Sequence, residues 1–543
     1  MTASTAIVSA ALPDPVKTDA GLIVPAMNSP QDVRVFRGIP FGAPPVGALR
    51  WKPTQPPAKW DGVRSGDKFG PVCIQPKGVG RLNVSVDLPD SPPTSEDCLS
   101  LNVWTGATRA NERRAVMVWI FGGAYTEGAG SSRHNDGEAL ARKGAVVVTF
   151  NYRLGPFGFF SHPELDAESG HNASGNQAVW DAIAALKWVQ RNIAAFGGDP
   201  ANVTIFGESA GAALSAGLVG SPEAKGLFHR AISESGAWMG LSMAPMRRKG
   251  PAFEPPRPGG ARGRPVVSPI AGAPLAELRA KPADDISKVF SGAGMVIDGW
   301  AIPEDESITF ANGKQNAVDV LIGSNKDEGS FTLRGPDAKQ WTERVRQQWT
   351  DLADDYLKLY PAGSDEQAAK SSEQAFSDEM AWHMWRYAQA QAAIGKRVYL
   401  YYFTHNPPTE PGKPNLRATH TAEIPYVFNN LKAPRVFPDT SSPELSSKNP
   451  AEIKLADIVS SYWVNFAKTG DPNGSSPSTS LRAGLSTPPG ASLPVWPQFR
   501  NRATGKRMEL GDSQQAGDVP LAKFALYDKL YARQLTATAG ATK

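Results

Sequence analysis

The residues best placed to do chemistry in this sequence lie around one serine. Residues 207–211 read G-E-S-A-G, with a glycine two positions before and two positions after Ser209. The apolar run 203–206 comes before this motif and the small residues 212–219 follow it, which is the order of strand, tight turn and helix in a nucleophile elbow. Glycine fits such a turn because it has no Cβ. A G-x-S-x-G match also arises by chance in a chain with 52 glycines, so the neighbouring segments decide its meaning.

A second loop of small residues could stabilise negative charge on a reacting oxygen. Residues 115–120 read A-V-M-V-W-I and predict a buried strand, which runs directly into F-G-G-A-Y at residues 121–125. Consecutive small residues after a strand leave backbone N–H groups unshielded, as an oxyanion hole requires. Taken alone, this segment also fits an ordinary glycine turn. Beside the elbow, it matches the loop expected after the third strand of an α/β-hydrolase.

Several sequence blocks follow one another in the order found in a known enzyme family. They are FRGIPF at 36–41, PPVGALRW at 44–51, EDCLSLNVW at 96–104, NYRLG at 151–155 and GNQAVWD at 175–181. Through these blocks, from about residue 33 to residue 499, the chain resembles the type-B carboxylesterases, which include the cholinesterases. The resemblance implies a single α/β-hydrolase domain over residues 1–543. Its fold class would be α/β, with a large and mostly parallel central sheet flanked by helices.

A serine hydroxyl needs a base to become a nucleophile, and the base needs a carboxylate to orient it. The block THTAEIPYVF at 419–428 resembles the family's segment around its catalytic histidine, which gives His420. The block VLIGSNKDEG at 320–329 resembles the segment around the family's acid, which gives Glu328, with Asp327 as the competing carboxylate. The order Ser209, Glu328, His420 is the α/β-hydrolase order. The sequence departs from the family at Thr421, where glycine is usual.

The resemblance assigns further roles around these three residues. It places an oxyanion hole at the N–H groups of Gly123, Ala124 and Ala210, with Phe121 where histidine is common. Ser235 matches a serine that lies behind the family's catalytic groups, although a role in a turn fits it equally well. Three aromatic residues each follow one of these blocks and are expected to line the acyl and alcohol pockets: Tyr125, Trp238 and Phe331.

This set of residues predicts hydrolysis of a carboxylic ester through an acyl-enzyme. Aromatic pocket walls leave limited volume, which favours small or aromatic esters. An amidase, a carbamate hydrolase or a lipase with the same triad is the alternative, because pocket shape sets the preference for the leaving group. A non-catalytic interaction protein is a further alternative, but such members of the family lose the serine.

Composition limits the other classes of function. The 543 residues carry a net charge of +4 from 57 basic and 53 acidic side chains, which is too balanced to indicate nucleic-acid binding. No apolar run approaches the roughly eighteen residues of a membrane span. No Cys/His cluster offers a metal site, so we expect no metal and no cofactor. The expected partner is a small-molecule ester, and the oligomeric state stays open.

The only two cysteines, Cys73 and Cys98, are 25 positions apart. They fall where the family has its first disulfide, although two unrelated buried thiols remain an alternative. A bridge of this span stabilises the fold by roughly 3–4 kcal/mol. It would also favour a periplasmic or secreted protein over a cytoplasmic one, even though the first twelve residues lack a complete signal-peptide pattern. The resemblance further implies two buried ion pairs, listed here: Arg50 with Glu96 and Arg153 with Asp181.

The elements that must position these residues alternate between strands and helices. Strand-like runs occur at 145–150, 203–206, 318–322 and 397–403. Residues 177–196 repeat apolar side chains every three or four positions, which predicts a helix with one apolar face. Alternation of this kind is typical of a parallel sheet covered on both faces.

Two segments depart from the family pattern. Residues 243–274 are rich in arginine, proline and glycine; an ordered loop, a disordered segment or a shifted reading frame would each produce such a sequence. Residues 475–492 are rich in serine, glycine and proline and predict an inserted surface loop.

Overall fold

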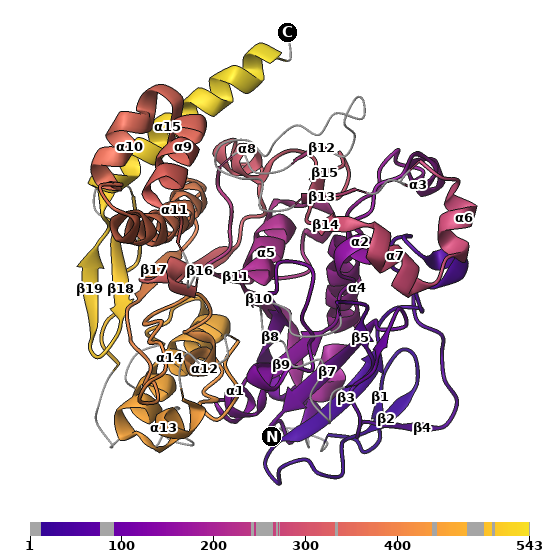
Figure 1. Ribbon diagram of the computed structural model, residues 1–543. Coiled ribbons are helices and arrows are strands. Elements are labelled where there is room, and N and C mark those ends of the chain that lie inside the picture. The colour runs from indigo at the N-terminus through magenta and orange to yellow at the C-terminus, as the bar shows by residue number, and fades with distance from the viewer. Residues whose placement is uncertain are drawn as a thin grey trace.

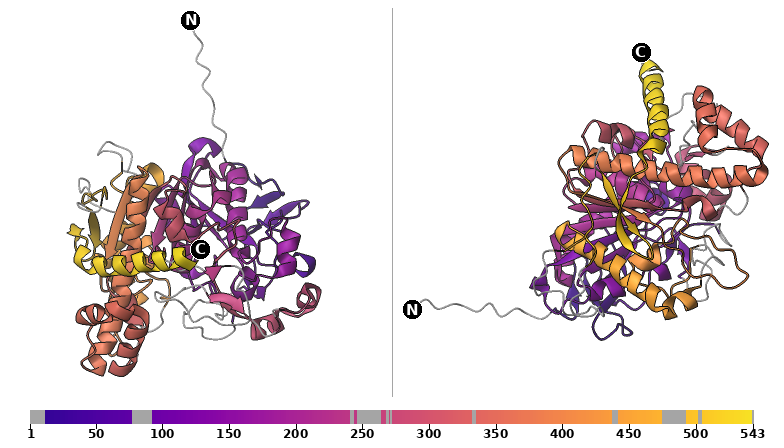
Figure 2. Two further views of the ribbon diagram at one scale, coloured as in Figure 1. Left: turned by 90° about the horizontal axis from the view of Figure 1, so that it is seen from above. Right: turned by 90° about the vertical axis from the view of Figure 1, so that its left-hand side faces the viewer.

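A computed structural model describes most of the chain (Figures 1 and 2). It describes residues 12–76, 92–240, 244–245, 264–267, 270, 272–331, 335–436, 442–474, 493–501 and 505–541. The predicted loop at 475–492 lies outside the described residues, and so does most of the segment 243–274.

A ten-stranded sheet runs through the middle of the molecule, in the order β19-β18-β17-β16-β11-β10-β8-β9-β7-β3. The strands from β18 to β9 in this order are parallel, and antiparallel pairs close both ends. The bounds of its strands are β3 Arg34–Pro40, β7 Ser100–Thr105, β8 Arg114–Ile120, β9 Val146–Phe150, β10 Gly198–Glu208, β11 Arg230–Glu234, β16 Asp319–Asn325, β17 Val398–Phe403, β18 Lys506–Leu510 and β19 Gln514–Asp518.

Helices cover both faces of this sheet (Figure 1). Successive side chains of a strand point to opposite faces. In β11, Ser233 interacts with Tyr387 of α11, whereas the next residue, Glu234, accepts a hydrogen bond from Trp463 Nε1 of α14 at 2.7 Å. Helices α11 and α14 therefore lie on opposite faces.

The helix bounds are α1 Glu138–Arg142, α2 Gly155–Gly158, α3 Pro163–Ser169, α4 Gln177–Asn192, α5 Ala210–Gly220, α6 Leu275–Ala280, α7 Ala283–Val289, α8 Glu306–Ala311, α9 Ala338–Trp349, α10 Ala353–Leu359, α11 Asp365–Ala393, α12 Ile424–Val427, α13 Pro443–Lys448, α14 Pro450–Thr469 and α15 Leu521–Ala541. The last of these, α15, projects from the molecule beside α9 and α10 (Figure 1). No helix of the described chain is long and apolar enough to cross a membrane.

The predicted alternation of strands and helices is confirmed, with shifts at the ends of elements. The predicted helix 177–196 is α4 followed by a 3-10 turn at Ile193–Phe196, and its apolar face is buried. The predicted strand 203–206 is the second part of the longer β10. Its first residue, Gly198, pairs with Arg114, and regular pairing resumes only at Val203, after an irregularity.

Short strands form smaller sheets at the edges of the molecule. One three-stranded sheet has the order β1-β2-β4, and three pairs join β5 with β6, β12 with β15 and β13 with β14. Their bounds are β1 Val16–Lys17, β2 Leu22–Val24, β4 Val63–Ser65, β5 Val72–Cys73, β6 Thr94–Ser95, β12 Ala244–Pro245, β13 Arg264–Val267, β14 Ser291–Ala293 and β15 Val296–Ile297.

The covalent and ionic links implied by the resemblance are present. Cys73 and Cys98 form a disulfide. Arg50 binds Glu96 through two hydrogen bonds of 2.6 and 2.7 Å. The third guanidinium nitrogen of Arg50 donates to three backbone carbonyls at the end of α6 and just after it, those of Leu278, Arg279 and Lys281.

The second ion pair, Arg153 with Asp181, is almost completely buried. Asp181 is 0% exposed and accepts hydrogen bonds from the Arg153 backbone N–H and guanidinium at 2.8 to 3.2 Å, and from the Thr54 hydroxyl. Because α4 carries Asp181, this pair fixes the segment after β9 to the helix that packs beside the elbow.

Candidate active site

The elbow predicted around Ser209 has the expected form. Ser209 lies between β10 and α5 with φ 54° and ψ −123°, a backbone conformation that L-residues rarely adopt. A Cβ on Gly207 would lie 2.6 Å from the Ile120 carbonyl oxygen, and one on Gly211 would lie 1.9 Å from the same atom. Only glycine at both positions lets β10, α5 and β8 approach this closely, so the turn presents the serine at the start of α5.

The serine hydroxyl is at one end of a hydrogen-bonded chain of three side chains. Its Oγ lies 2.8 Å from His420 Nε2, and His420 Nδ1 lies 2.6 Å from Glu328 Oε2. Glu328 is 0% exposed, and its other oxygen accepts the backbone N–H of Asn325 at 2.7 Å. The structure thus brings together the three residues predicted as nucleophile, base and acid, which lie up to 211 positions apart in the chain.

The competing carboxylate, Asp327, has a different environment. It accepts a hydrogen bond from Arg417 Nε at 2.9 Å, and its backbone N–H donates to the Ala418 carbonyl at 2.9 Å. Asp327 therefore holds the loop that leads to His420, while the next residue, Glu328, contacts the imidazole itself.

The loop predicted as the oxyanion hole follows β8 and lies beside the serine. Gly123, Ala124 and Tyr125 all have positive φ, at 114°, 52° and 62°. Phe121 anchors the start of the loop, because its ring stacks on Tyr152 at 4.2 Å and its carbonyl accepts the Tyr152 hydroxyl at 2.7 Å. Gly123 lines the same cavity as Ser209 and His420.

Two acidic residues that the sequence did not single out lie close to the imidazole. Glu208 Oε1 is 3.2 Å from His420 Nε2, and Glu208 is 2% exposed. Glu423 is also buried, and its carboxylate accepts a hydrogen bond from the side chain of Asn325, the last residue of β16. Glu208 is the variable position of the G-x-S-x-G pattern, so nothing in the pattern itself marks it.

These carboxyl groups change the proton affinity of the site. Burial alone would lower the pKa of His420, but the nearby Glu208 and Glu328 outweigh burial and raise it to about 9. Burial raises the pKa of Glu208 well above its usual range, with Glu423 and Glu328 acting in the same direction and His420 against it. Burial, and then Glu328, raise the pKa of Glu423 to about 7.

Comparison with known proteins assigns this arrangement to a family. The model of the family described as "Carboxylesterase family" matches residues 16–527. The chain belongs to the carboxylesterase family. It is 36% identical over 510 residues to a fumonisin B1 esterase of Sphingopyxis macrogoltabida, with 90% of this chain and 85% of that protein aligned. It is 35% identical over 467 residues to a para-nitrobenzyl esterase of Bacillus subtilis, with 81% of this chain and 87% of that protein aligned.

Solved structures of carboxylesterases have the same fold. A para-nitrobenzyl esterase aligns with a TM-score of 0.74 at 30% identity, over 94% of this chain and 98% of that one. A carboxylesterase of Geobacillus stearothermophilus aligns with a TM-score of 0.72 at 30% identity, over 95% of this chain and 99% of that one. The predicted α/β-hydrolase fold of this carboxylesterase is confirmed.

The other predicted site residues of this carboxylesterase are more dispersed. The Phe331 ring lies 5.9 Å from the His420 ring, whereas Tyr125 packs on Phe159 and Trp238 packs on His383. None of these three aromatic residues lines the cavity that holds Ser209. Their role in substrate binding stays a prediction.

Ser235 lies directly behind the elbow. It is fully buried with φ 54°, and its backbone N–H donates to the Gly323 carbonyl at 2.9 Å. Within the described part of the chain its hydroxyl has no hydrogen-bond partner. The preceding residue, Glu234, accepts the Ser209 backbone N–H at 2.8 Å, so the end of β11 supports the elbow through its backbone.

Proposed function

We propose that this carboxylesterase hydrolyses carboxylic esters with Ser209 as nucleophile, His420 as general base and acid, and Glu328 as the group that orients the imidazole. The observation that carries this proposal is the chain of contacts from Ser209 Oγ to His420 and on to Glu328, at 2.8 and 2.6 Å. Both distances are within hydrogen-bond reach for proton transfer.

In the first half of the reaction, Ser209 Oγ attacks the ester carbonyl carbon and its proton passes to His420 Nε2. Glu328 accepts the Nδ1–H and stabilises the imidazolium that forms. When the tetrahedral intermediate collapses, the bond from carbon to the ester oxygen breaks and Nε2 gives its proton to the departing alcohol. The acyl group then remains on Ser209.

In the second half, water attacks the acyl carbon while His420 Nε2 takes a proton from it. Collapse of this second intermediate releases the carboxylic acid and returns the proton to Ser209 Oγ. In both halves the carbonyl oxygen becomes negative, and we assign its stabilisation to the N–H groups of Gly123, Ala124 and Ala210. The position of Gly123 in the wall of the cavity supports this assignment.

We propose small or aromatic esters as the substrates. The cavity that holds Ser209 and His420 has a volume of about 410 Å³ including its open mouth, and it includes the aromatic side chains Trp119 and Phe121. A related protein acts, by its name, on para-nitrobenzyl esters. Amides, carbamates and long-chain lipids are the alternatives for the same catalytic groups.

We also propose an extracytoplasmic location, either periplasmic or secreted. The disulfide between Cys73 and Cys98 supports this, because such bonds persist mainly in oxidising compartments.

The test is Ser209→Ala, assayed with phenyl acetate and with an anilide of the same acid. The wild type should hydrolyse the ester much faster than the amide, and a fluorophosphonate should label Ser209 in the intact protein. Ser209→Ala should lose turnover and labelling while keeping its thermal unfolding temperature. Ser221→Ala, a buried serine at the other end of α5, is the matched control and should keep both. Turnover of even a few per cent in purified Ser209→Ala would show that another group is the nucleophile.

A further inference from the structure

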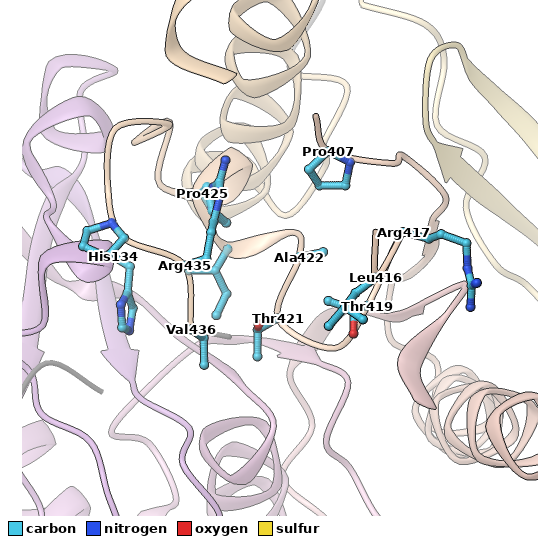
Figure 3. A pocket seen from close by; sticks show the side chains of 12 residues that line it. His134, Pro407, Leu416, Arg417, Thr419, Thr421, Ala422, Pro425, Arg435 and Val436 are labelled. Carbon is cyan, nitrogen blue, oxygen red and sulfur yellow. The ribbon is translucent and has the colours of Figure 1, made fainter. Parts of the chain in front are cut away.

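A second cavity adjoins the one that holds Ser209. It has a volume of about 420 Å³ including its open mouth, and the residues on either side of His420, Thr419 and Thr421, line it (Figure 3). Its walls are mainly apolar and include Pro407, Leu416, Ala422 and Pro425, but the side chain of Arg435, whose Nη2 donates to Ser446 Oγ at 2.9 Å, also lines it. Arg417, which also lines it, is paired with Asp327 and Glu373 and points away from the other lining side chains in Figure 3.

Four residues line both cavities: His134, Thr421, Ile424 and Val436. These residues therefore form the boundary between the two spaces. In Figure 3 the labelled members His134, Val436 and Thr421 follow one another from the left of the view toward its centre. The boundary is uncharged near neutral pH, because burial lowers the pKa of His134 to about 4.

Thr421 is the unusual member of this boundary. It is buried, and it has φ 72°, a left-handed conformation that β-branched residues avoid. Strain of this kind persists where the surroundings hold a side chain in place, and it is concentrated at sites that contact ligands. Glycine would adopt this backbone without cost, so the threonine contributes its side chain to the boundary at the expense of strain.

The chemistry fixes which part of the substrate faces this boundary. His420 Nε2 lies 2.8 Å from Ser209 Oγ, and the same atom must protonate the departing alcohol. The alcohol portion of the ester therefore lies on the His420 side of the site. Thr421 follows His420 directly and lines the same cavity as Ser209, so it borders the space that the alcohol enters.

We propose that Thr421 limits the size of the alcohol portion, and that the second cavity is an extension of the alcohol pocket that substitution at Thr421 opens to bulkier aryl alcohols. This inference rests on the proposed function, because it needs His420 as the proton donor to the leaving group. It adds a residue that determines specificity and a binding space that the bulkier alcohol of an ester would fill.

The test compares esters with one acyl group and different alcohols. Phenyl acetate, 2-naphthyl acetate and biphenyl-4-yl acetate all give the same acetyl-enzyme, so their differences in kcat/KM report acylation and the fit of the alcohol. In Thr421→Gly, the ratio of kcat/KM for biphenyl-4-yl acetate to that for phenyl acetate should rise by at least about tenfold over the wild type. An unchanged ratio would overturn the proposal.

Two further variants separate space from loop mobility. Thr421→Ala removes the same γ atoms without giving the backbone the freedom of glycine, so it should raise the ratio too. A rise in Thr421→Gly alone would mean that loop mobility is responsible and would overturn the proposal. Val436→Ala widens the same boundary from another segment and keeps the test decisive if substitution at Thr421 prevents folding.

Controls distinguish failure of this inference from failure of the proposed function. Active sites are counted with a fluorophosphonate, so loss of folded enzyme does not enter the ratio. Phenyl hexanoate against phenyl acetate tests the acyl side, and an equal change there would indicate general loosening and overturn the proposal. A wild type that turns over phenyl acetate through Ser209, with ratios unmoved in all variants, would leave the proposed function intact and remove only this inference.

Discussion

Replacing Glu208 by glutamine should move the activity of this enzyme to lower pH. Glu208 Oε1 lies 3.2 Å from His420 Nε2, the atom that must be free of a proton if His420 is the base, as we propose. The carboxylate stabilises the imidazolium and so contributes to raising the pKa of His420 to about 9. Glutamine keeps the shape of the side chain and removes the charge.

The size of the shift follows from this distance. Two unit charges 3.2 Å apart interact by about 5 kcal/mol at an effective dielectric constant of about 20. This is an upper limit, because burial raises the pKa of Glu208 itself and so reduces the charge it carries near neutral pH. A neighbouring opposite charge typically shifts a pKa by about 1 to 3 units, and we expect the lower end of that range here.

The assay is kcat/KM for phenyl acetate between about pH 5 and pH 10, which reports the ionisation of the free enzyme. Because neutral His420 is the active form in the proposed mechanism, activity should rise with pH, and the midpoint in the wild type should lie above the usual value of about 6.5 for histidine. In Glu208→Gln the midpoint should fall by about one unit. Glu234→Gln is the matched control, since Glu234 is buried nearby but bonds Trp463 rather than the imidazole. A midpoint that stayed in place or rose in Glu208→Gln would refute the reasoning, as would a shift of equal size in Glu234→Gln.

Three other predictions concern stability and substrate range. Asp181→Asn leaves the buried Arg153 guanidinium without its counter-charge and should lower the free energy of unfolding by about 3–5 kcal/mol, measured by urea denaturation; a loss below 1 kcal/mol would contradict the argument. Thiol titration in denaturant without reductant should find no free thiol, and Cys73→Ser with Cys98→Ser should cost roughly 3–4 kcal/mol; two titratable thiols in exported protein would count against the disulfide. With a fixed alcohol, kcat/KM should be highest for short acyl chains in a series from acetate to palmitate, and a maximum at palmitate would replace the small-ester proposal with a lipase.

The sequence predicted those parts of the site that depend on local backbone geometry. The elbow could be recognised because a turn that places a Cβ 1.9 Å from the Ile120 carbonyl excludes every residue but glycine at position 211. Glu328 and His420 were assigned because each lies in a block that resembles the family's segment around its catalytic acid or histidine. Glu328 also follows the parallel strand β16, and the carboxyl ends of parallel strands meet at one edge of a sheet.

The sequence predicted the ends of elements less well, because apolar periodicity does not report backbone pairing. The first residues of β10 are partly exposed and include a proline, yet Gly198 already pairs with β8. A pattern based on buried side chains therefore starts this strand only at Val203.

Other contacts around the site could not be predicted from the sequence. Glu208, Glu423 and His134 approach the imidazole or its cavity from three different elements, and each is an ordinary polar residue in its local sequence. The left-handed backbone at Thr421 was equally hidden, because a threonine is a poor predictor of positive φ.

Local sequence patterns and contacts made in the folded chain inform on different properties of this enzyme. The residues that we propose break the ester bond are positioned by a turn and by loops that follow strands, and the sequence marks them by local patterns. The proton affinity of His420 and the space beside Ser209 depend instead on neighbouring side chains that the folded chain brings together. Glu208 raises the pKa of His420, and Thr421 lines the cavity that holds Ser209. A change at these converging residues can alter the working pH or the accepted alcohol while the nucleophile, base and acid stay in place. The reaction class therefore follows from the local pattern, whereas the pH range and the choice of alcohol that we propose depend on packing that only the folded chain reveals.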